Sequence, residues 1–225
     1  MNNKSDTFPR IRAWLQEHLH LIKTYPSELH RLLILLSLID SFAQDCSNQS
    51  RQNQKSFVDF LQTYCKKYNA ILKSQCPVTL YYHYLDKLPN LHLHLQEGRI
   101  YYANSCGAIA EAERIICYLD EKEKVAAQLK HSYAGLIYQL RNKLSHEFMM
   151  LNMPINFQNN EDIQLPHMAT CIENNKVSHW SLCIPEHFVR EVAIDAFENY
   201  LSDCEERNYI PFSNQNRKCY YAWYD

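Results

Sequence analysis

An arginine and a histidine five positions apart, Arg141 and His146, are the residues of this sequence best suited to chemistry. The imidazole of a histidine accepts and donates protons near neutral pH. The guanidinium of an arginine carries a permanent charge on a planar fork that matches phosphate oxygens. Asn142 follows Arg141 directly, and its amide can orient the imidazole or contact the phosphate. The pattern indicates proton transfer beside a phosphate group.

The stretch 122–148 predicts one long amphipathic helix that positions these residues. Its apolar stripe consists of Val125, Leu129, Tyr133, Leu136, Leu140 and Leu144. Counted from Leu140 in steps of about 100°, Arg141 lies at about 100° and His146 at about 240°. We expect Arg141, Asn142, Ser145 and His146 to face away from the leucines, toward solvent or a partner. The alternative is an ordinary solvated face on which Arg141 pairs with a surface carboxylate.

The hexapeptide from Arg141 to His146, followed by Glu147 and Phe148, resembles the signature of the HEPN superfamily. These are helical domains, many of them metal-independent ribonucleases, whose signature is an arginine, a polar residue, three further residues and a histidine late in a core helix. The segment 32–60, in which a polar loop separates two apolar stretches, is similar to the first helical hairpin of that family. The β-hairpin and the last helix, described below, lie outside the resemblance.

The resemblance implies a cytoplasmic, homodimeric endoribonuclease that attacks the phosphate with the RNA 2′-OH and uses neither a metal nor a cofactor. Arg141 then stabilises the phosphate charge, His146 transfers protons, and Asn142 has a positioning role. Two proton transfers are needed and one copy offers one candidate histidine, so the family's pairing of two copies supplies the second. The implied setting is a prokaryotic toxin or antiviral effector, with an antitoxin or another regulatory protein as a further partner. Phe148 replaces the tyrosine that is modified in some HEPN toxins, which argues against control by that route.

Basic residues gather around this motif. Between 122 and 146 there are five of them and one acid, Glu123. We expect Lys130, Lys143 and Ser145 to contact RNA, since a positive strip attracts a phosphate backbone. An equally good interpretation is that the lysines near 122 interleave with glutamates on a solvated face.

The whole sequence predicts a mainly α fold, a HEPN-like helical bundle forming a single domain over 1–225. Its core helices are expected within about 27–148. The segments MATCIE and KVSHWSLCI, joined by Asn174-Asn175, predict a small β-hairpin over about 168–184. Pro185 then opens a C-terminal helix over about 185–206.

Composition excludes several other classes of protein. The three glycines stand alone, which excludes a Gly-rich phosphate loop and a dinucleotide fingerprint. Nine scattered cysteines without a C-x-x-C pair argue against a metal site or a disulfide scaffold and favour reduced thiols. A net charge of −2 argues against a general polyanion binder. With no apolar run long enough to span a bilayer and no signal-peptide pattern, we expect a cytoplasmic protein without membrane contact.

Two other function classes remain open. The chain can be a catalytically inactive HEPN-like module that binds RNA, a nucleotide or a protein partner, or it can be a helical scaffold without a ligand. His92 and His94 alternate as metal ligands do on a strand, but without a third ligand they are interpreted as surface histidines. The tyrosine clusters at 81–84 and 220–224 are interpreted as packing rather than as platforms for stacked bases.

Overall fold

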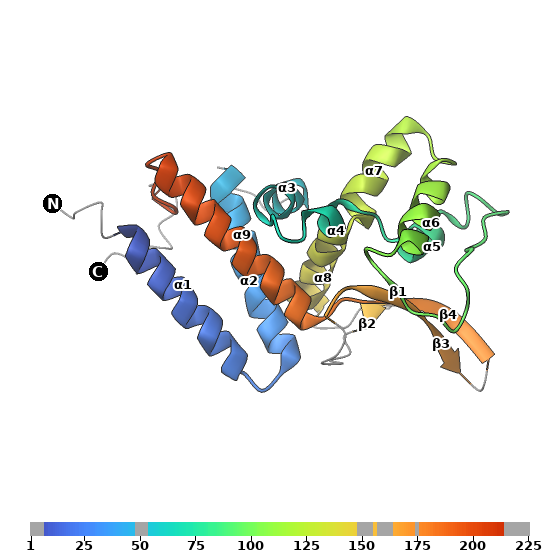
Figure 1. Cartoon of the computed structure of the whole chain (residues 1–225), viewed down its shortest axis with the longest axis horizontal. Coiled ribbons are helices and arrows are strands. Elements are labelled where there is room, and N and C mark those ends of the chain that lie inside the picture. The colour runs from blue at the N-terminus through green and yellow to red at the C-terminus, as the bar shows by residue number, and fades with distance from the viewer. Residues whose placement is uncertain (1–6, 48–53, 148–154, 157–163, 174–175, 214–225) are drawn as a thin grey trace.

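A computed structural model describes residues 7–47, 54–147, 155–156, 164–173 and 176–213, and the protein is mainly helical over these ranges. One group of helices packs around a central helix; in a second group, two helices contact a small sheet and two contact the first group (Figure 1). The first group consists of α1 (Thr7–Thr24), α2 (Glu28–Ser47), α3 (Gln54–Tyr64), α8 (Tyr133–Glu147) and α9 (Glu186–Glu206). The second consists of α4 (Asn69–Lys73), α5 (Pro77–Tyr84), α6 (Cys106–Ile116) and α7 (Glu121–His131).

Helix α2 is central because its sequence is apolar on nearly every side. It contacts α1, α3, α8 and α9, and Leu35, Leu36 and Ile39 are fully buried. Near its end Phe42 packs against the rings of Phe197 and Tyr200 of α9, with centroids 4.3 and 5.9 Å apart. Such aromatic pairs add to the free energy gained by burying their area. The bundle thus extends beyond the predicted core range of 27–148, because α1 and α9 contribute to the same core.

The sheet contains the predicted hairpin and two short additional strands. Strands β3 (His167–Glu173) and β4 (Lys176–Cys183) pair antiparallel, and the predicted turn residues 174–175 lie outside the described part. The sheet order is β1-β3-β4-β2, in which β1 (Tyr101–Tyr102) is antiparallel to β3 and β2 (Ile155–Asn156) is parallel to β4. The C-terminal helix α9 follows with Pro185 as its N-cap, so both the hairpin and this helix were predicted correctly.

The predicted continuous helix over 122–148 is wrong, because the chain breaks at Ser132. Here the backbone is extended (ψ 152°), which ends α7 at His131 and starts α8 at Tyr133. The segment before α5 stabilises the break: the Cys76 amide donates to the His131 carbonyl at 2.9 Å, and the Tyr133 amide donates to the Ser74 carbonyl at 3.1 Å. These bonds satisfy backbone groups that the helix would otherwise have paired internally.

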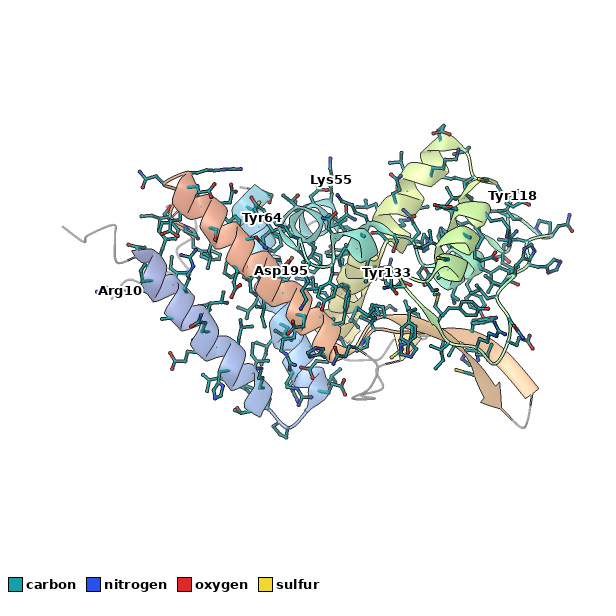
Figure 2. All side chains as sticks on the ribbon, viewed as in Figure 1. Arg10, Lys55, Tyr64, Tyr118, Tyr133 and Asp195 are labelled. Atoms are coloured by element: carbon teal, nitrogen blue, oxygen red, sulfur yellow. The ribbon has the colours of Figure 1, made fainter. Side chains whose placement is uncertain are left out.

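The break changes which residues of the stripe are buried. Tyr133, Leu136, Leu140 and Leu144 of α8 are at most 2% exposed, as predicted, whereas Val125 of α7 is 67% exposed. Figure 2 shows Tyr133 between the two groups of helices and Tyr118 at the periphery. The stripe prediction is therefore right for α8 and wrong for the start of α7.

No helix among the described ranges is long and apolar enough to cross a membrane.

Gly135, in the first turn of α8, permits the close approach of α7 to α8. A Cβ atom at this position would lie 2.1 Å from the backbone oxygen of Leu129. We predict that Gly135→Ala destabilises the fold by about 1–3 kcal/mol, although the better helix propensity of alanine would stabilise a free helix by up to about 1 kcal/mol. The measurement is the free energy of unfolding in urea. Gly107→Ala, whose Cβ meets only the movable ring of Tyr101, is the control and should stay within about 1 kcal/mol of wild type. A stabilised Gly135→Ala would contradict the close approach.

The last residue of α7, His131, is 2% exposed, and its pKa is lowered to about 3 by burial and by the nearby charges of His83 and Lys130. Below pH 6.5 the His131 side chain therefore binds a proton in the unfolded chain, whereas in the folded chain it stays neutral down to about pH 3. We predict that stability falls as the pH is lowered from 6.5 toward 3, by up to about 1.4 kcal/mol per pH unit from this group. Above pH 6.5 the group contributes no pH dependence.

Unfolding free energies across this pH range test the prediction. His131→Gln should show a shallower loss of stability than wild type. His92→Gln, which alters an exposed histidine, should follow wild type. The difference between the two variants isolates His131 from His83 and His167, whose pKa values burial also lowers. Parallel curves for all three proteins would disprove the assignment.

Candidate functional site

The guanidinium of Arg141 is held between two side chains where α8 packs on α2. Its Nη2 donates to Oδ2 of Asp40 at 2.8 Å, and its Nη1 donates to Oδ1 of Asn142 at 2.9 Å. The side chains of Arg141 and Asp40 are 11% and 4% exposed. The Asp40 carboxylate also accepts a hydrogen bond from Gln44 at 3.2 Å. We call Asp40, Arg141 and Asn142 the arginine cluster.

The sequence of α2 explains why the cluster forms. Asp40 is the only charged residue between Leu32 and Ala43. A carboxylate carried into the core by such a helix requires a paired charge and hydrogen bonds, since its desolvation is otherwise very unfavourable. Arg141 supplies both from the facing helix. The pair therefore fixes the register and the rotation of α8 against α2.

The expectation that Arg141 faces solvent or a partner is wrong. At about 100° from Leu140 it borders the apolar stripe, so its long side chain bends toward α2 and reaches Asp40. The alternative partner expected from the sequence was a surface carboxylate, whereas the observed carboxylate is buried. Asp40 was missed altogether. The available signal was a single acid within an otherwise apolar, buried helix.

The other predicted residues of the motif differ in their surroundings. Asn142, Lys143 and Ser145 are half-buried, and the Ser145 hydroxyl donates to the Asn142 carbonyl at 3.2 Å. Lys130 is exposed, but it lies on α7, on the other side of the break at Ser132. The structure thus places Asn142 beside Arg141 and leaves Lys130 on a separate helix.

The position of His146 is defined only along the chain. Its backbone belongs to α8, five residues and about 1.4 turns after Arg141. Its imidazole lies outside the described part, as does Phe148. Its approach to Arg141, and to a second copy of the chain, stays a prediction.

In the described ranges, no group of three or more histidine, cysteine, aspartate or glutamate side chains is arranged to hold a metal ion. His92 and His94 are both exposed, in line with their interpretation as surface histidines. The carboxylate of Glu111 accepts a hydrogen bond from the backbone amide of His94 at 2.8 Å and forms an ion pair with Arg114 at 2.7 Å. Glu111 is therefore engaged in holding this segment on α6.

A double-mutant cycle measures how strongly the arginine cluster couples α2 to α8. Asp40→Ala and Arg141→Ala each leave a buried charge unpaired, and each should destabilise the fold by about 3 kcal/mol or more. The double variant should be more stable than the sum predicts by about 1–3 kcal/mol. The exposed pair Arg12–Glu205, at 2.8 Å, is the control and should couple by less than about 1 kcal/mol. Equal coupling in the two cycles would contradict a buried pair.

A scan against protein-family models, a search of curated proteins and a search of solved structures each found no match to this chain.

Proposed function

We propose that this protein is a metal-independent endoribonuclease of the HEPN type, active as a homodimer. The observation that carries the proposal is the arginine cluster: the guanidinium of the motif arginine is fixed by Asp40 and Asn142 on the helix that also carries His146. Arg141 and Asn142, two of the three residues of the cluster, belong to the motif on which the family resemblance is based, and Asp40 reaches them from α2. A cytoplasmic toxin or antiviral effector, controlled by an antitoxin or another regulatory protein, is the proposed setting.

A guanidinium held in this way suits the stabilisation of a phosphorane. Charged groups that are fixed before the substrate arrives do not have to reorganise as charge develops on the phosphate. Asp40 and Asn142 restrict the orientation of Arg141, and 11% of the Arg141 side chain is exposed. Lys143, half-buried on the same helix, adds positive charge close by.

His146 is proposed to transfer the protons. Cleavage by the 2′-OH requires a base for the proton of that hydroxyl and an acid for the leaving 5′ oxygen, and histidine serves either role near neutral pH. The proton taken from the 2′-OH passes to one imidazole, while a protonated imidazole gives its proton to the 5′ oxygen. Two copies of His146, one from each protomer, provide this pair.

Incubation of the purified protein with total RNA, with and without a chelator, tests the proposal. Cleavage should persist in the chelator. His146→Ala should be slower by about 100-fold or more. Arg141→Lys, which keeps the charge that Asp40 requires but loses the fork, should be slower by about 10-fold or more.

Matched controls separate loss of chemistry from loss of structure. His92→Ala alters an exposed histidine, and Arg114→Lys alters an arginine that is likewise paired with a buried carboxylate, that of Glu111. Both should retain wild-type cleavage. Full activity of folded His146→Ala would eliminate the mechanism.

A second candidate function is an inactive HEPN-like module that binds RNA, a nucleotide or a protein partner. The observation in its favour is that the Arg141 charge is already paired with Asp40 and largely buried. This function gives no cleavage under any condition, together with an RNA affinity that falls steeply with salt if RNA is the ligand.

A further inference from the structure

A second constellation, remote in sequence from the arginine cluster, lies where α7 packs against α5. His131, at the end of α7, is 2% exposed. Its Nδ1 is 3.3 Å from Oγ1 of Thr79 on α5. The His83 ring, on the same helix as Thr79, lies with its centroid 4.7 Å from that of His131, at an interplanar angle of 51°. His83 itself is exposed.

The hydrogen bonds of Thr79 determine which nitrogen of His131 carries the proton. The Thr79 hydroxyl donates its only hydrogen to the Cys76 carbonyl at 3.1 Å. Its oxygen can therefore only accept from His131, so Nδ1 is the protonated nitrogen. Nε2 then carries a lone pair, and this buried atom has no hydrogen-bond partner. A buried acceptor without a donor destabilises the fold unless something else binds it.

The same arrangement is the one that prepares a histidine to bind a metal. Histidine ligands commonly donate their second ring nitrogen to an oxygen, which fixes the tautomer and aims the lone pair of the other nitrogen. Two imidazoles that bind one ion tetrahedrally, with nitrogens about 2.1 Å from it, have centroids about 5 Å apart. The 4.7 Å between His83 and His131 agrees with that separation.

The charges around the two rings have opposing effects on a cation. Lys130 and Lys87 lie near the two rings and their positive charges disfavour the binding of a cation, whereas the negative charge of Glu123 favours it. The Lys87 ammonium is paired with the Glu123 carboxylate at 2.8 Å, which reduces its repulsion. Burial is the largest cause of the lowered pKa of both histidines.

We propose that His83 and His131 together bind one divalent transition-metal ion of the class that prefers imidazole nitrogen, such as Ni²⁺, Zn²⁺ or Cu²⁺. Solvent completes the coordination on the exposed side of His83. The ion joins α5 to the end of α7 and satisfies the Nε2 lone pair. The site involves α5 and α7, whereas the arginine cluster involves α2 and α8, so its role is to stabilise the fold and it takes no part in RNA cleavage.

Titration of the full chain with Ni²⁺ at pH 7.5, in a reducing buffer that does not chelate, tests the proposal. Calorimetry should show one saturable site per chain, and the midpoint of thermal unfolding should rise with Ni²⁺. His83→Ala, at an exposed position, should fold as wild type does and bind at least about 10-fold more weakly, with little thermal shift. His92→Ala, the control for adventitious binding by surface histidines, should match wild type.

Thr79→Val provides the second arm, because it removes the oxygen that orients His131 and leaves both ligands in place. It should weaken binding by about 10-fold, while its far-ultraviolet circular dichroism reports whether the fold is kept. Wild-type affinity in His83→Ala, or the absence of a saturable site in wild type, would overturn the proposal. Neither result bears on RNA cleavage, which is measured in a chelator.

Discussion

A carboxylate that is carried into the core by an apolar helix limits what the rest of this protein can do. Asp40 is 4% exposed in its side chain and needs a charged partner at hydrogen-bonding distance. Arg141 meets that need only if α8 packs on α2 with one particular side turned toward it. The leucines of α8 are compatible with several small rotations, because apolar contacts are not directional. The ion pair selects one of them, and the backbone position of His146 follows from that choice.

The break at Ser132 is the second constraint, and it acts on the same helix. By ending α7 at His131, it lets α8 run along α2 while α7 packs against α8, α3 and α5 (Figure 1). Gly135 allows the two helices to meet closely at the break. The unpaired Nε2 of His131 and the arginine cluster thus lie on either side of one bend in the chain. The bend gives each group its own packing partners.

Local signals in the sequence were sufficient for the C-terminal helix, for the buried face of α8 and for the hairpin. Pro185 marks the start of α9, the Asn174-Asn175 pair separates two segments of strand character, and the apolar periodicity of α8 identifies its buried face. The break at Ser132 was missed because its cause is a pairing with residues near 75, which no local pattern in 122–148 reveals. The inward turn of Arg141 was missed for the same reason: helical angles define a direction from the axis, but Asp40, 101 residues away, decides where a long side chain bends. The short strands β1 and β2 are likewise defined by their partners rather than by their own two residues.

The same geometry of the Arg141–Asp40 pair is compatible with a structural role and with a catalytic role. The two roles differ only in what the Arg141 charge does when a phosphate group binds. A purely structural arginine has its charge neutralised by its carboxylate, and its surroundings gain nothing from a further anion. In a catalytic site the same carboxylate restricts the guanidinium, so that its exposed edge offers donors that are already oriented. Arg141 lies between these cases, since it is mostly buried yet adjoins Asn142 and Lys143 on a half-buried face. The substitution by lysine separates them, because it satisfies Asp40 in either case and removes the fork that only a phosphate requires.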